Sequence, residues 1–121
     1  MNIYITENKE LLVGLDDNVL SKETGLKLLE AKTADKTTEK HVPVVKIEGE
    51  KVTVVVGDVL HPMTEEHQIL YILVETNKGT YIQKLKSTDE PKAIFKIQAD
   101  EKILRVYEYC NLHGLWETSE F

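Results

Sequence analysis

The residues best suited to chemistry in this sequence are its single cysteine and its four histidines. Cys110 and His113 lie three residues apart in the segment YCNLHGLW, and the other histidines are His41, His61 and His67. Imidazole and thiolate groups are ligands for iron, zinc, copper and nickel. One cysteine cannot form an internal disulfide, so Cys110 is a packed thiol, a reactive thiol or a metal ligand. Each residue taken alone is a weak signal, because a buried thiol usually packs as a small hydrophobic group.

Taken together, the five residues predict a metal site. Every histidine stands at the edge of a strand-like run, where loops can bring together side chains from distant parts of a β domain. Five protein ligands are more than the four of a closed structural zinc site, and they would leave an octahedral metal one open position. An open position indicates catalysis.

The elements that must position these side chains have the pattern of β-strands. Runs rich in Val, Ile and Tyr follow one another from HVPVVKI, which begins at residue 41, to ILRVYEY, which ends at residue 109. They alternate with a period of two and are separated by turn residues. Gly49 and Gly79 lie between consecutive runs, where a residue that tolerates positive φ favours antiparallel hairpins. Six or seven short strands without a strong helical pattern predict an all-β protein with an immunoglobulin-like β-sandwich or barrel.

The composition also divides the chain into two parts. Residues 33–40, TADKTTEK, contain no large apolar side chain and have the composition of a connector. We therefore expect a small β-rich module over residues 1–36 and a main β domain over residues 37–121. About 30 residues cannot close a hydrophobic core alone, so the module must pack against another surface.

Charge and hydropathy exclude several classes of partner. The net charge of −6 argues against nucleic acid and anionic membranes, because neutralising phosphates requires a basic patch. The N-terminus has no apolar run of signal-peptide length, and nothing downstream approaches the length of a membrane span. We expect a cytoplasmic protein whose partners are small molecules or other proteins.

Three motifs of the main domain resemble those of the superoxide reductases, the neelaredoxin and desulfoferrodoxin family. They are EKHVP at residues 39–43, HPMTEEH at residues 61–67 and CNLHGLW at residues 110–116. The resemblance covers residues 39–116 and implies a seven-stranded, immunoglobulin-like β-barrel. It also implies an enzyme that reduces superoxide to hydrogen peroxide at one mononuclear non-haem iron, which an external electron donor then reduces again.

The same resemblance implies a role for each residue of the motifs. The iron would have four equatorial imidazoles and one axial thiolate, from His41, His61, His67, His113 and Cys110. Lys40 would steer superoxide to the site and stabilise the bound anion. Glu39 would occupy the sixth position in the resting ferric state.

The N-terminal part resembles the desulforedoxin-like module of two-domain relatives, with one difference. In those relatives four cysteines of the module hold a second iron, whereas this module contains no cysteine. We therefore expect no second redox centre and a module that serves folding or the contact of a homodimer. Electrons would arrive from outside the chain, from rubredoxin or a similar carrier.

Two other classes of protein remain open at this point. A blue-copper electron carrier is also a β-sandwich with a late cysteine and nearby histidines, and its weak axial ligand is commonly methionine. No methionine follows Cys110, and four histidines are more than that site uses. A non-catalytic β-sandwich would need no metal, and it predicts that Cys110→Ser has almost no effect.

Overall fold

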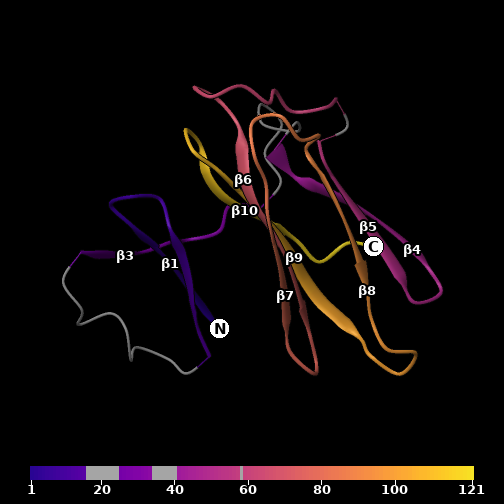
Figure 1. The fold of residues 1–121 in the computed structure, drawn as a ribbon. Helices are drawn as coiled ribbons and strands as arrows, with labels where there is room; N and C mark the ends of the chain where they lie inside the picture. The colour runs from indigo at the N-terminus through magenta and orange to yellow at the C-terminus, as the bar shows by residue number, and fades with distance from the viewer. Residues whose placement is uncertain (16–24, 34–40, 58) are drawn as a thin grey trace. The chain divides into compact units, whose positions relative to one another are not determined.

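The computed structural model describes residues 1–15, 25–33, 41–57 and 59–121 (Figure 1). Within these ranges the chain forms ten β-strands and divides into two compact units, Met1–Glu30 and Ala31–Phe121. The boundary that we expected between residues 36 and 37 lies outside the described residues. In the part of the chain that is described, no helix is long and apolar enough to cross a membrane.

The first unit is a small antiparallel sheet, as expected for a β-rich module. Its three strands are arranged in the order β2-β1-β3. They are β1 (Asn2–Thr6), β2 (Leu11–Gly14) and β3 (Leu26–Leu28). The central strand carries the apolar run Ile3, Tyr4 and Ile5, and all three side chains are buried.

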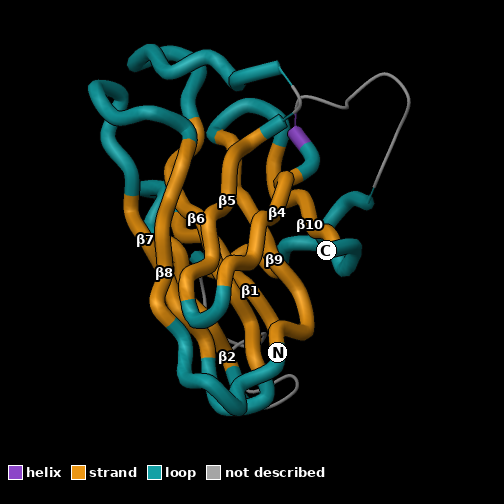
Figure 2. Tube along the Cα trace, turned by 90° about the vertical axis from the view of Figure 1, so that its right-hand side faces the viewer, coloured by secondary structure: helices purple, strands orange, loops and turns teal. Residues whose placement is uncertain are grey.

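The second unit contains seven strands in two antiparallel sheets, which confirms the immunoglobulin-like fold (Figure 2). One sheet has the order β4-β5-β8 and the other has the order β10-β9-β6-β7. The three-stranded sheet consists of β4 (Pro43–Glu48), β5 (Lys51–Val56) and β8 (Lys92–Lys96). The four-stranded sheet consists of β6 (Ile69–Thr76), β7 (Thr80–Lys84), β9 (Ile103–Cys110) and β10 (Gly114–Thr118).

The hydrophobic core of this unit lies between the inner faces of the two sheets. Alternate residues of each strand point inward because successive side chains of a strand lie on opposite faces. The cluster includes Val52 and Val54 of β5, Ile72 and Val74 of β6, and Val106 of β9, all with no exposed surface. The period-two pattern in the sequence therefore identified the strands and their buried faces.

Two hairpins lie where Gly49 and Gly79 predicted them, but their turns differ. Gly49 between β4 and β5 has φ 62°, the left-handed conformation that glycine adopts easily. Gly79 does not take a positive φ. Instead Thr76 closes the β6–β7 turn, because its N–H donates to the Gly79 carbonyl at 2.8 Å and its hydroxyl accepts from the N–H groups of Lys78 and Gly79.

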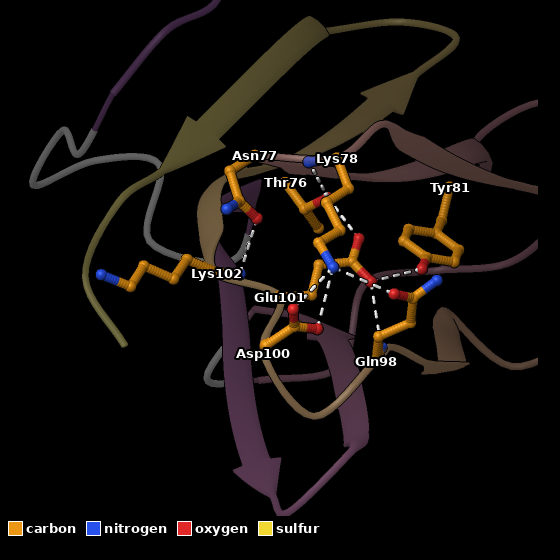
Figure 3. Close-up of polar contacts among 8 residues, drawn as sticks. All are labelled: Thr76, Asn77, Lys78, Tyr81, Gln98, Asp100, Glu101 and Lys102. Atoms are coloured by element: carbon orange, nitrogen blue, oxygen red, sulfur yellow. Dashed lines mark hydrogen bonds and ion pairs between the residues drawn. The ribbon is translucent and has the colours of Figure 1, made fainter.

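A polar cluster joins this turn to the loop between β8 and β9 (Figure 3). The Glu101 carboxylate accepts hydrogen bonds from the Thr76 hydroxyl, from Tyr81 Oη at 2.8 Å and from the Gln98 N–H at 3.0 Å. Since β6 begins at Ile69, which pairs with Cys110, and ends at Thr76, the cluster lies at the opposite end of β6 from Cys110.

Candidate metal centre

The structure brings the four histidines and the cysteine together at one end of the β-sandwich. One side-chain ligand atom from each residue lies within 4.8 Å of all the others, in a set formed by His41, His61, His67, Cys110 and His113. Glu39 and Lys40 lie outside the described residues. The convergence is long-range, because the set spans residues 41 to 113.

The four imidazole rings surround a common centre. Successive rings in the order His41, His61, His67, His113 and back to His41 have centroids 4.9, 4.5, 5.1 and 4.6 Å apart. Each of these neighbouring pairs is edge to face, with interplanar angles between 66° and 81°. The diagonal pair His41 and His67 is more widely separated, at 6.4 Å. Such a ring of imidazoles presents several nitrogens to a single point.

Strand ends place most of these residues. His41 precedes β4 by two residues, His67 precedes β6 by two residues, and Cys110 is the last residue of β9. His113 immediately precedes β10, in a turn that Gly114 closes with φ 83°. His61 lies farther from its strand, and its N–H donates to the carbonyl of Val56, the last residue of β5, at 3.2 Å.

A backbone contact fixes which nitrogen of His61 can bind a metal. His61 Nδ1 lies 2.7 Å from the carbonyl oxygen of Pro62, so this nitrogen carries the proton and donates it. The lone pair is then on Nε2, the atom that lies 3.6 Å from Cys110 Sγ. Hydrogen bonding of the remote ring nitrogen to a carbonyl is the usual way in which proteins orient a metal-binding histidine.

Asn111 joins the His67 loop to the turn that follows β9. Its amide nitrogen donates to the Glu66 carbonyl and its amide oxygen accepts from the Gln68 N–H, both at 2.9 Å. The backbone N–H of Asn111 also donates to the Gln68 carbonyl at 3.2 Å. Because Glu66 and Gln68 flank His67, one side chain holds both neighbours of a candidate ligand.

The Cys110 thiol is fully buried at the inner end of β9. Burial raises its pKa, whereas hydrogen bonds from the backbone N–H groups of Leu112 and His113 act in the opposite direction. These two N–H groups are the donors that a thiolate requires once a metal has displaced the proton. The turn that carries His113 therefore also prepares the sulfur environment.

Trp116 covers the site from the side of His41. Its ring stacks on the His41 imidazole with centroids 5.1 Å apart and an interplanar angle of 18°. Its indole Nε1–H donates to the His113 carbonyl oxygen at 3.2 Å. Trp116 is 3% exposed, so a buried indole covers this face of the His41 imidazole.

The donor set fits a transition metal. Two nitrogens bound at right angles to one metal at about 2.1 Å lie about 3.0 Å apart, and His41 Nε2 lies 3.0 Å from His113 Nδ1. Cys110 Sγ lies 3.6 Å from His61 Nε2 and 3.8 Å from His113 Nδ1, so the sulfur adjoins the same centre. Imidazole with thiolate suits iron, zinc or copper, whereas calcium and magnesium prefer oxygen ligands.

Two features near the sulfur were not identified from the sequence. Glu108 shares the inward face of β9 with Cys110, is fully buried, and has no hydrogen-bond partner among the described residues. Burial raises its pKa well above the ordinary value, because the charged form of the carboxyl is poorly solvated there. Its spacing of two residues from Cys110 could have indicated that it lies beside the sulfur, because residues i and i+2 of a strand share a face. The other feature is Lys32, which contacts the His113 carbonyl.

Comparison with known proteins identifies relatives across most of the chain. The Desulfoferrodoxin family model matches residues 33–119. A desulfoferrodoxin homolog of Archaeoglobus fulgidus is 48% identical over 93 residues, which are 77% of this chain and 73% of that protein. A desulfoferrodoxin of Clostridium acetobutylicum is 34% identical over 121 residues, with 97% of this chain and 94% of that protein covered. The crystal structure of the superoxide reductase from Treponema pallidum matches 97% of this chain and 95% of its own, with TM-score 0.84 and 34% identity.

Proposed function

The chain belongs to the desulfoferrodoxin family and is a superoxide reductase, and we propose that its clustered histidines and cysteine hold the catalytic iron. The ligand set is His41, His61, His67, His113 and Cys110. The observation that carries this assignment is the convergence of five ligand atoms from distant segments within 4.8 Å. The bound iron would supply one electron and an open position for superoxide.

The ligand set favours an anionic substrate and its reduction. Four neutral imidazoles and one thiolate lower the charge of ferrous iron to roughly +1, which still attracts an anion. The Cys110 thiolate would donate electron density to the iron, as a cysteine ligand does in haem enzymes, and so would favour giving an electron to superoxide over taking one. Reduction, with an outside donor restoring the ferrous state, is therefore the turnover that we propose, rather than disproportionation.

The burial of the residues indicates the side from which superoxide enters. Cys110, His41 and His61 are buried, whereas His113 is exposed and His67 is partly exposed. A small anion therefore reaches the imidazole side of the site, while the sulfur faces the protein interior. Protection of the thiolate from solvent also slows its oxidation.

Two residues next to His41 in the sequence complete the proposed site. Lys40 would supply a positive charge that steers superoxide to the site and stabilises the anion, and Glu39 would be a further ligand for the iron in its oxidised resting state. The support for both roles is the EKH order of the first motif, which places them directly before a proposed ligand.

The electron donor, the assembly and the location also belong to the proposal. Cys110 is the only cysteine in the sequence, so the chain offers no second cysteine-bound iron. Electrons then come directly from a rubredoxin-like carrier. We further propose that residues 1–36 contribute to a homodimer, as the resemblance to a desulforedoxin-like module suggests, and that the protein works in the cytoplasm.

The deciding experiment is the visible spectrum of the iron-loaded protein, reduced and then oxidised, beside that of Cys110→Ser. We expect a thiolate-to-iron charge-transfer band that arises on oxidation, disappears on reduction and is absent from the variant. An intense blue copper band would favour the electron-carrier class instead. A protein that is colourless in both states would refute the iron–thiolate site.

A further inference from the structure

Lys32 is fixed beside the proposed site by its own backbone. It forms an isolated parallel bridge with Trp116, next to the edge strand β10. Its N–H donates to the Leu115 carbonyl at 2.9 Å, and its carbonyl accepts from the Glu117 N–H at 2.8 Å. The position of the Lys32 Cα is therefore set by two backbone hydrogen bonds, and only its side chain has to be ordered.

The side chain of Lys32 contacts the turn that carries a proposed ligand. Its Nζ donates to the His113 carbonyl oxygen at 3.0 Å and lies 5.1 Å from the centroid of the Trp116 ring. Trp116 Nε1–H donates to the same carbonyl at 3.2 Å. One carbonyl thus accepts from both side chains, and the ammonium lies within the range of a cation–π interaction with the indole.

These contacts connect Lys32 to two of the proposed ligands. His113 is reached directly through its carbonyl, and His41 is reached through Trp116, whose ring stacks on the His41 imidazole. A surface lysine without partners would lose much side-chain entropy on adopting such a conformation. Here a charge-assisted hydrogen bond and an aromatic face offset that loss.

We propose that Lys32 is a positioning residue of the metal site, which orders Trp116 and the His113 turn and supplies a positive charge that raises the reduction potential of the bound iron. This inference rests on the proposed iron site. The electrostatic part follows from the charge of the two oxidation states, because a nearby cation opposes the gain of positive charge when ferrous iron is oxidised. Lys32 does not touch the reacting atoms. Its positioning role acts through Trp116 and His113, and its charge acts on the iron through space.

The test compares Lys32→Met and Lys32→Arg with Lys96→Met. Methionine keeps the length of the side chain without its charge, whereas arginine keeps both the charge and a donor. Lys96 is an exposed lysine of β8 that pairs with Lys51, at the opposite end of β5 from Val56 and the site. Its replacement therefore controls for the loss of one surface charge.

The first measurement is the tryptophan fluorescence of the metal-free proteins, excited at a wavelength that the tyrosines do not absorb, which reports on Trp116 because the chain has one tryptophan. We expect K32M to shift the emission to longer wavelength and to increase quenching by acrylamide, while K32R and K96M match the wild type. Emission from K32M that equals that of K96M would overturn the positioning role.

The second measurement is the reduction potential of the iron-loaded proteins, followed through the thiolate charge-transfer band. At a fixed electrode potential we expect the ratio of oxidised to reduced iron to rise by up to about fivefold in K32M, the scale of an exposed charge interaction. An unchanged ratio in K32M would overturn the electrostatic role. Absence of the band from the wild type would instead refute the proposed iron site, while the fluorescence result would still stand.

Discussion

Replacing Asn111 with alanine tests whether the proposed ligands are held in place before the metal binds. The side chain makes two hydrogen bonds of 2.9 Å, one to each neighbour of His67. The bond to the Glu66 carbonyl is exposed and the bond from the Gln68 N–H is part-buried. Since neither bond is fully buried, we take the net value of each bond as its loss rather than a full desolvation penalty. At about 1 kcal/mol for each bond, the variant should lose about 2 kcal/mol of stability.

The same loss should weaken metal binding. If the His67 loop loosens in the metal-free variant, metal binding must order it again, and about 2 kcal/mol corresponds to an affinity up to roughly thirtyfold lower. The unfolding midpoint should fall by about 10 °C, at roughly 5 °C for each kcal/mol in a domain of this size. The two effects have one cause and should appear together.

Asn77→Ala provides the matched control for this experiment. Asn77 Oδ1 accepts from the Lys102 N–H at 2.9 Å, in the β6–β7 turn at the opposite end of β6 from Cys110 (Figure 3). The Asn77→Ala variant should therefore lower the unfolding midpoint without altering the affinity for metal. The assays are thermal unfolding followed by circular dichroism and a competition titration of Co²⁺ or Fe²⁺ against a chelator.

One result would contradict the proposed role of Asn111. If Asn111→Ala lowers the midpoint but binds metal as tightly as Asn77→Ala, the His67 loop does not depend on Asn111 for its position. The metal would then assemble the site, and the hydrogen bonds would contribute only to the stability of the fold.

Four further predictions concern pH, the capture of superoxide and the ferric spectrum. Iron should be lost as the pH falls through the ordinary histidine pKa of about 6.5, because imidazole and thiolate must be deprotonated to bind, and metal analysis after dialysis at pH 5 and pH 7.5 checks this. The Gln98 N–H, followed by the Thr76 hydroxyl, lowers the pKa of Glu101. The stability from these contacts is therefore present above the unfolded pKa of about 4.3 and is lost as the pH falls through the lower folded value, so Glu101→Gln should flatten the pH dependence of urea unfolding in acid. Lys40→Ala should slow superoxide capture and flatten its salt dependence in pulse radiolysis, whereas Glu39→Ala should shift the ferric spectrum with little change in capture rate; an unchanged rate or an unchanged spectrum would contradict the respective role.

The sequence predicted the strands of the second unit and the residues that cluster, for different reasons. Val52, Val54 and Val56 alternate with partly exposed residues, so the period of two shows both the strand and its buried face. The histidines could be grouped because their residue types share one chemistry, and the motif order supported the grouping. Neither argument required knowledge of the tertiary structure.

The contacts that hold the site could not be predicted in this way. Asn111 and Lys32 act through backbone carbonyls and N–H groups, which every residue possesses and which no sequence pattern marks. The contact between Lys32 and His113 joins residues 81 positions apart and exists only because a bridge places Lys32 beside β10. The turn at Gly79 could not be predicted for the same reason. Hydrogen bonds from the N–H groups of Lys78 and Gly79 to the Thr76 hydroxyl close this turn, and no positive φ at Gly79 is needed.

The position of Cys110 depends on strand register more than on the metal. Cys110 faces the interior because it is an even number of residues from Val106, whose side chain lies in the core. A shift of one residue in the pairing of β9 with β6 would turn Cys110 outward and move the sulfur to the other face of the sheet, away from the imidazoles. The same shift would take Val106 out of the core, in which it is fully buried. Packing of the core disfavours the shifted register and therefore also fixes the position of the Cys110 sulfur. The metal-free protein should already hold this sulfur beside the histidines.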